Sequence, residues 1–157
     1  MKIGILCAIP KEIKYFDLPP NSAQMLGGRT FYSKKEESHE LIVVECGLGK
    51  VNAALVSTLL IQQFDCELLV FSGVAGGIDP ELEIGDVVVG ESLIQYDYGA
   101  LNDGQLQVYR AGSIPMGAPE NSAEFSLDPE IKKIIKAALP GVRMGTILTG
   151  DVFLQCG

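Results

Sequence analysis

The sequence contains no tryptophan, one histidine and four cysteines, and no two cysteines form a C-x-x-C pair. The spacing of a metal site is therefore absent, and a disulfide framework is disfavoured. Basic residues are also scarce, since 12 lysines and arginines stand against 20 aspartates and glutamates, a net charge of −8. Such a surface repels phosphate backbones and anionic lipids, which argues against nucleic acids and membrane surfaces as partners.

Long apolar runs are missing as well. No stretch approaches the ~18 residues that a membrane-spanning helix needs. The apolar run at the N-terminus ends at Pro10-Lys11-Glu12 without a small-residue cleavage site, so we expect a cytoplasmic protein. Three of the four cysteines lie beside or within apolar segments, where a free cysteine is usually a small buried hydrophobe.

The chain has 157 residues, of which 47% are hydrophobic, so it can form one compact domain over residues 1–157. Short apolar segments predict strands, and glycine, proline and a capping aspartate mark the helices between them. The expected strands are residues 2–8, 29–33, 40–45, 68–72, 86–89 and 142–148. The expected helices begin at Pro10, after Gly47-Leu48-Gly49-Lys50, and at Asp128-Pro129-Glu130, the last ending near Leu139. This alternation predicts a layered α/β fold with a largely parallel sheet.

Residues 96–121 form a long stretch that carries glycine and proline and has no clear period. Long irregular segments are usually functional or mobile. His39 lies in a charged turn and is expected to be solvated. Ser72 has no visible histidine or acid partner, which disfavours a hydrolase triad.

Four segments follow predicted strands and are candidates for a site, because ligands of open α/β sheets bind beyond the carboxyl ends of strands. They are residues 8–12, 47–50, 73–77 and 150–154. In the first, Glu12 is either a solvated carboxylate in the first turn of a helix or a general base. The helix dipole favours its ionised form, which could take a proton from water.

The two glycine-rich segments differ in what they indicate. The segment at Gly47 lacks the spacing of a P-loop, and Asn52 stands where a dinucleotide fingerprint needs its third glycine. A tight strand-to-helix turn and a ligand contact both remain open for it. The segment 73–77 holds three glycines and one alanine, which favours close approach of a ligand to the backbone.

In this order, the segments resemble the nucleoside phosphorylase superfamily, specifically its methylthioadenosine/S-adenosylhomocysteine nucleosidase branch. The resemblance spans nearly the whole chain. It is carried by MKIGILCA (1–8) with Glu12, GLGKVNAA (47–54), SGVAGG (72–77), Pro80 with IGDVVV (84–89), and TGDVF (149–153). It implies a three-layer α/β/α fold with a mixed, mostly parallel central sheet, a homodimer, no metal and no redox cofactor.

The implied reaction is hydrolysis of the N-glycosidic bond of a purine thionucleoside, which releases adenine. By resemblance, Glu12 activates the water. Ile9 and Leu48 line the side of the pocket that holds the 5′-substituent and the water, and Val74, Ala75 and Gly76 lie under the ribose and base. Phe153 stacks on the purine, and the backbone of Leu154 reads its edge. Residues 96–121 are expected to set the 5′-substituent.

Two departures from the family pattern bear on this expectation. Val74 stands where the family usually has serine, which removes a hydroxyl contact. Members of the family are also longer, and the part absent here carries the Met-Glu motif for the ribose hydroxyls and the aspartate that protonates the base. We therefore expect an apparently truncated chain that lacks the general acid.

Two other functions stay open. A phosphorylase would hold a phosphate dianion where Glu12 stands, which costs about 4 kcal/mol of repulsion at ~4 Å and an effective dielectric near ~20. Recruitment of Lys11, Arg29 or Arg110 could offset that repulsion. A nucleoside-binding module without catalysis is the other alternative, since the general acid is missing.

Overall fold

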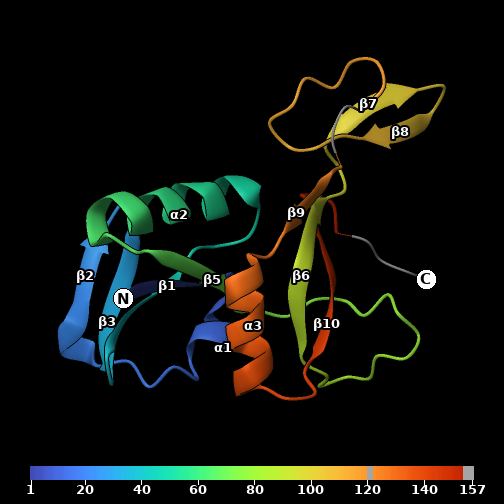
Figure 1. The fold of residues 1–157 in the computed structure, drawn as a ribbon. Helices are drawn as coiled ribbons and strands as arrows, with labels where there is room; N and C mark the ends of the chain where they lie inside the picture. Colours follow the sequence, from blue (N-terminus) through green and yellow to red (C-terminus); the bar gives the residue numbers. More distant parts are fainter. Residues whose placement is uncertain (120–121, 154–157) are drawn as a thin grey trace. The chain divides into compact units, whose positions relative to one another are not determined.

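The computed structural model describes residues 1–119 and 122–153 (Figure 1). The chain divides into two compact units, Met1–Gly76 and Gly77–Gly157. Each unit has its own sheet and is described by itself.

The first unit is built on a mixed sheet of five strands in the order β2-β3-β4-β1-β5. The strands are β1 (Lys2–Cys7), β2 (Ala23–Leu26), β3 (Arg29–Glu36), β4 (His39–Glu45) and β5 (Leu68–Phe71). The central strand β1 pairs in parallel with both β4 and β5, so that Ile5 lies opposite Val43 on one side and Val70 on the other. β2, β3 and β4 pair in antiparallel fashion.

Helix α2 (Lys50–Phe64) covers one face of this sheet (Figure 1). Its buried residues are Val56, Leu60 and Phe64, and the Phe64 ring stacks on Phe31 with 4.6 Å between ring centroids. On the other face, a smaller cluster gathers around Val43. The short helices α1 (Pro10–Ile13) and η1 (Pro20–Ser22) belong to the connection between β1 and β2. The sheet is thus packed on both faces.

The second unit holds two small sheets. β6 (Val88–Gln95) lies between β10 (Arg143–Thr149), which is parallel to it, and β9 (Glu124–Ser126), which is antiparallel. β7 (Gly99–Asn102) and β8 (Gln105–Val108) form a hairpin. Helix α3 (Pro129–Ala138) is tied to β6 by Lys132, whose Nζ lies 2.5 Å from Oε2 of Glu91.

The strands and helices expected from the sequence are all present, but several boundaries and pairings differ. The strand expected at 86–89 is β6, which starts at Val88 and runs to Gln95. The stretch 96–121, expected to be irregular, contains the β7–β8 hairpin. Strands β2 and β9 were not predicted.

The expected fold class needs one correction. The sheets are mixed, as predicted, but only three of the seven strand pairings among the described residues are parallel, so "mostly parallel" is wrong. The cause is local, because the chain from β2 to β4 turns back twice through short hairpins. The three layers and the single domain over 1–157 stay predictions.

Within the described residues, no helix is both long and apolar enough to cross a membrane. Cys7, Cys46 and Cys66 are buried and free, which confirms the structural burial expected for three of the cysteines. Cys156 lies outside the described residues.

The N-cap of α3 provides a test of the second unit. Oδ1 of Asp128 accepts hydrogen bonds from the backbone N–H groups of Glu130 (2.8 Å) and Ile131 (3.2 Å). Because α3 buries none of its residues, the cap is a substantial part of what holds it. We expect Asp128→Ala to lower the free energy of unfolding by about 1 kcal/mol, measured by urea titration. Asp128→Asn should lose far less, and equal losses in the two variants would contradict a capping role.

Candidate active site

Three loops meet at one edge of the five-stranded sheet, because β1, β4 and β5 run in the same direction and end there. The loops comprise residues 8–12, 47–50 and 73–76. Backbone pairing continues past the strands, since the N–H of Cys46 donates to the carbonyl of Cys7 at 2.8 Å. The sequence predicted a site at this carboxyl edge, and these three predicted segments do lie together there.

The half-buried carboxylate of Glu12 is held by three backbone N–H groups. Oε2 accepts from Ala8 at 2.7 Å and from Ile9 at 3.2 Å, and Oε1 accepts from Val74 at 3.0 Å. A carboxylate has about four acceptor positions, so roughly one remains for a water or a substrate hydroxyl. Glu12 thus joins the loops after β1 and β5, and its bond to the N–H of Ile9, the N-cap of α1, also gives it the helix-terminal role that the sequence left open.

Gly73 allows this bridge. A Cβ at position 73 would lie 2.8 Å from Oε1 of Glu12 and 2.9 Å from Cε1 of Phe71, both closer than real contacts allow. The absence of a side chain thus keeps the carboxylate against the loop 73–76. The sequence predicted a close approach to the backbone here, and what approaches in the structure is the carboxylate of Glu12.

The turn after β4 is fixed from outside by two polar side chains. Gly47 and Gly49 have φ values of +85° and +93°, a region that favours glycine. Nη2 of Arg29 donates to Oδ1 of Asn52 at 3.1 Å, and Nδ2 of Asn52 donates to the carbonyl of Leu48 at 2.6 Å. The turn is therefore pinned to both β3 and α2.

The predicted binding residues of the first unit lie at this same edge. Ile9 donates its N–H to Glu12, and Val74 does the same from the opposite loop. The residue Leu48 is 71% exposed and Val74 82% exposed, and Ala75 and Gly76 are exposed too. These residues leave apolar surface around the carboxylate open to a ligand.

Phe153 belongs to the second unit. There Oη of Tyr96 donates to the carbonyl of Val152 at 2.6 Å, and the Tyr96 ring lies against Gly150, so the turn that leads to Phe153 is anchored to the end of β6. Phe153 is 86% exposed. Leu154, predicted to read the purine edge, lies outside the described residues.

The buried thiols beside the edge are not nucleophiles. Burial is the main cause that raises the pKa of Cys7, from 9.0 to about 11, and the carboxylate of Glu12 adds to it. Burial raises the pKa of Cys46 as well, although the nearby Arg29 cation opposes that shift. Both thiols are therefore protonated near neutral pH.

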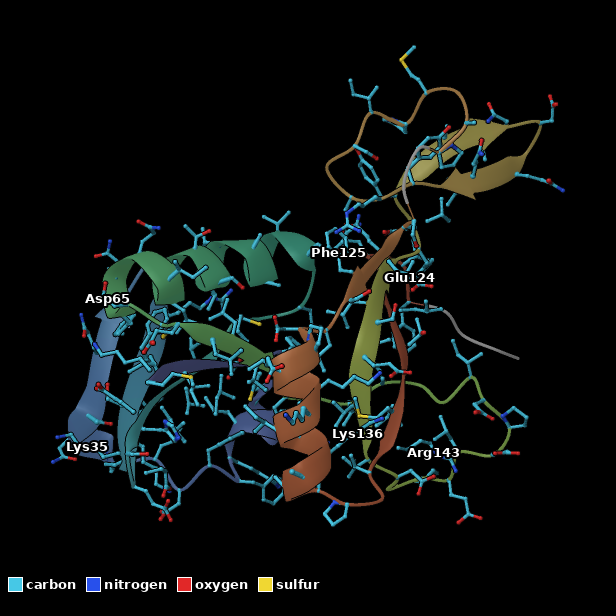
Figure 2. All side chains as sticks on the ribbon, in the orientation of Figure 1. Lys35, Asp65, Glu124, Phe125, Lys136 and Arg143 are labelled. Carbon is cyan, nitrogen blue, oxygen red and sulfur yellow. The ribbon has the colours of Figure 1, made fainter. Side chains whose placement is uncertain are left out.

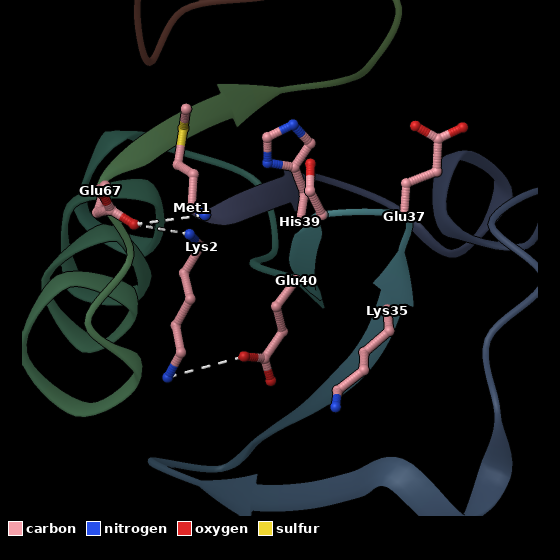
Figure 3. Close-up of a pocket in the computed structure, with 8 residues that line it drawn as sticks. Met1, Lys2, Lys35, Glu37, His39, Glu40 and Glu67 are labelled. Atoms are coloured by element: carbon pink, nitrogen blue, oxygen red, sulfur yellow. Dashed lines mark hydrogen bonds and ion pairs between the residues drawn. The ribbon is translucent and has the colours of Figure 1, made fainter.

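The described residues contain no cluster of histidine, cysteine or carboxylate side chains that could hold a metal ion. A polar hollow of about 340 Å³ lies at the opposite, amino end of the strands (Figure 3). Two ion pairs lie in it, since Nζ of Lys2 lies 3.9 Å from Oε2 of Glu40 and the amino terminus lies 4.0 Å from Oε1 of Glu67. The exposed His39 lines it, as expected of a solvated histidine. This hollow is a charged surface remote from the three loops.

The segment that follows β8 encloses a second hollow, of about 260 Å³, within the second unit. Tyr109 is buried there, and Oη of Tyr98 donates to the carbonyl of Ser113 at 2.6 Å. The guanidinium of Arg110 lies 3.9 Å from the centroid of the Phe125 ring, which Figure 2 labels. Much of the segment 96–121 is therefore organised rather than irregular.

Sequence reasoning missed the pinning role of Arg29 and Asn52. Arg29 was considered only as a cation that a phosphate could recruit, and Asn52 only as a break in a glycine pattern. The two are 23 residues apart, and no spacing rule joins them. Their contact depends on the antiparallel pairing of β3 with β4.

Comparison with known proteins identifies relatives of this chain. The family model of the phosphorylase superfamily matches residues 2–156. The 5′-methylthioadenosine/S-adenosylhomocysteine nucleosidase of Mycobacterium bovis is 36% identical over an alignment that covers 98% of this chain and 68% of that protein. The aminodeoxyfutalosine nucleosidase of Campylobacter jejuni is 34% identical, with 98% and 66% covered.

Solved structures of such nucleosidases also resemble this chain. The S. pneumoniae 5′-methylthioadenosine/S-adenosylhomocysteine nucleosidase with the transition-state inhibitor MT-ImmA superposes with a TM-score of 0.81 at 30% identity, covering 98% of this chain and 66% of that one. This chain spans between 64% and 70% of the length of such relatives, about two thirds.

The raised pKa of the Cys7 thiol predicts how the free energy of unfolding depends on pH. The pKa of Cys7 is about 11 when folded and near 9.0 when unfolded, so above pH 9 the folded state binds more protons than the unfolded state. The free energy of unfolding should therefore be constant below about pH 8 as far as Cys7 is concerned, and fall between pH 9 and 11. Urea titrations of the wild type and Cys7→Ala should show a shallower fall in the variant. Identical slopes would contradict the assignment.

Proposed function

This chain belongs to the phosphorylase superfamily, and from that premise we propose that it hydrolyses the N-glycosidic bond of a purine thionucleoside such as 5′-methylthioadenosine or S-adenosylhomocysteine, releasing adenine. The observation that carries the proposal is the Glu12 carboxylate, fixed by three N–H groups between two loops at the carboxyl edge of the sheet. The names of the relatives support the same reaction.

The chemistry requires a carboxylate of this kind. When the purine departs, the electron pair of the C–N bond goes to the base and the sugar becomes oxocarbenium-like. A carboxylate beside the anomeric carbon stabilises that positive charge and orients a water molecule. The water oxygen bonds to the anomeric carbon and its proton passes to Glu12. The purine takes its own proton from another group.

The resemblance to the family supports roles for the other candidate residues. Apolar Leu48 and Ile9 would line the 5′-substituent, and the open loop Val74, Ala75 and Gly76 would lie under the ribose and base. Phe153 would stack on the purine and Leu154 would read its edge. We propose that residues 96–121 determine which 5′-substituent the site accepts.

Phosphorolysis fits the edge less well. A phosphate dianion would face the carboxylate of Glu12, with a repulsion of about 4 kcal/mol at ~4 Å and an effective dielectric near ~20. Two of the cations that could offset it already have partners, since Arg29 donates to Asn52 and Arg110 lies over the ring of Phe125. We therefore propose water, rather than phosphate, as the attacking group.

We also propose a cytoplasmic homodimer without a cofactor. The outer face of α2 supports an interface between copies, since Val51 is 80% exposed and Leu55 50% exposed. Large apolar patches on a soluble protein are usually covered by a partner. The free thiols of Cys7, Cys46 and Cys66 suit a reducing compartment.

Glu12→Gln in the full-length protein tests the water-activating role. The amide keeps the size of the side chain but cannot accept the proton, so kcat for adenine release from 5′-methylthioadenosine should fall by about 10²–10⁴-fold. Glu45→Gln is the matched control, because it removes a carboxylate at the end of the neighbouring strand β4. Unchanged turnover in Glu12→Gln would remove Glu12 from the mechanism. A need for phosphate would select the phosphorylase, and saturable binding of adenine by a protein that cleaves nothing would select the binding module.

Gly73→Ala tests the close approach independently. The new methyl group must push the carboxylate of Glu12 or the ring of Phe71 aside, because both lie within 3 Å of its position. We expect kcat to fall at least tenfold, with a smaller change in KM, since a misplaced base costs rate more than binding. Gly145→Ala is the control, because the nearest atom to a Cβ there, Cγ1 of Val88, lies at an ordinary contact distance of 3.5 Å. Equal kinetics in the two variants would contradict the role of Gly73.

A further inference from the structure

Two polar side chains, those of Arg29 and Asn52, support the Gly47–Leu48–Gly49 turn. The guanidinium of Arg29 lies directly against Gly47, where a Cβ would come within 2.9 Å of Nη2. Arg29 also donates to Asn52, which donates in turn to the carbonyl of Leu48. One amide side chain thus accepts from a strand residue and donates to the turn. Arg29, Asn52 and the Leu48 carbonyl together are called the turn bridge below.

Two other hydrogen bonds reach the turn, from Sγ of Cys46 to the carbonyl of Gly47 at 3.3 Å and from the N–H of Ala53 to the carbonyl of Gly49 at 3.1 Å, but neither of them holds Leu48 itself. Both of its glycines have positive φ, and glycine loses more conformational freedom on ordering than any other residue. The side chain of Leu48 is mostly exposed, so apolar packing contributes little to its position. The place of Leu48 is therefore set mainly by the turn bridge.

The turn bridge is joined to Glu12 by two further hydrogen bonds. Cys46, which precedes the turn, donates its N–H to the carbonyl of Cys7 at 2.8 Å. Ala8, the first residue after β1, donates to Glu12 at 2.7 Å. The charges of Arg29 and Glu12 both reach the Cys46 thiol, where they act on its pKa in opposite directions. Both charged groups are therefore near Cys46.

We propose that Arg29 and Asn52 are positioning residues that hold Leu48 at a fixed place relative to Glu12 and thereby set how strongly the site discriminates between 5′-substituents. This inference rests on the proposed nucleosidase activity. An apolar 5′-alkylthio group gains from contact with a Leu48 that is held in place, whereas a small 5′-hydroxyl group gains little. Neither Arg29 nor Asn52 has to touch the substrate for this effect.

The geometry requires these side chains in their present roles. A lysine at position 29 could donate to Asn52, but it lacks the flat guanidinium that lies against Gly47. An aspartate at position 52 could still accept from Arg29, but it could not donate to the carbonyl of Leu48. Asn52→Asp therefore breaks one bond of the turn bridge and keeps the other.

The decisive measurement is competition between two substrates in the full-length protein, 5′-methylthioadenosine and adenosine. The ratio of their kcat/KM values does not depend on how much of the enzyme is folded, because both compete for the same active molecules. We expect Arg29→Met and Asn52→Asp to lower this ratio about tenfold, the size of effect that a lost apolar contact has on discrimination. Arg29→Lys should fall between these variants and the wild type. Lys35→Met, which removes a cation from the other end of β3 (Figure 2), should leave the ratio unchanged.

Amide hydrogen exchange provides a second arm that does not need activity. The amides of Leu48, Gly49 and Lys50 should exchange at least threefold faster in Arg29→Met and Asn52→Asp than in the wild type or Lys35→Met. Unchanged exchange would overturn the turn bridge whatever the kinetics. If exchange rises and the wild type cleaves both nucleosides, an unchanged ratio would overturn the role in discrimination. A wild type that cleaves neither would overturn the proposed function, and the role in discrimination with it.

Discussion

The carboxylate of Glu12 is the contact on which the candidate site depends. It joins the N-terminal turn of α1 to the loop after β5 by accepting N–H groups from both, and Gly73 leaves room for it to do so. Hydrogen bonds to an ionised group are stronger than those between neutral groups. The same interactions therefore hold two loops together and fix the carboxylate that we propose as the base, so that the structural role of Glu12 and its proposed chemical role depend on the same contacts.

The first unit was largely readable from sequence because its parallel strands are short apolar runs bounded by glycine or proline. β1, β4, β5 and α2 were predicted within a few residues of their observed bounds. The strands that were missed are short and mostly exposed, so burial leaves no pattern in them. β9, for example, has three residues and buries none of them. The buried face of α2 was not predicted, because its apolar residues lie on several sides and only packing selects Val56 and Leu60.

Candidate site residues that directly follow a predicted strand could be predicted from the sequence. Residues that only strand pairing brings together could not. Glu12 and the glycine loops stand directly after apolar strands, which the rule for α/β sheets places at one edge. Arg29 and Asn52 meet only because β3 folds back along β4 in one register, with Phe31 opposite Val44. A shift of that register by one residue would turn the side chain of Arg29 to the other face. That information resides in the tertiary fold.

The hydrogen bonds at this carboxyl edge favour water over phosphate as the attacking group of the proposed reaction. Backbone N–H groups at the ends of strands are natural donors to an anion. Here the N–H groups of Ala8, Ile9 and Val74 already donate to a carboxylate of the protein. A phosphate would have to displace that carboxylate and then remain beside its charge, whereas a neutral water can occupy the acceptor position left over. The carboxylate of Glu12 thus occupies the donors that phosphorolysis would use, and in the proposed reaction it is also the base that hydrolysis needs.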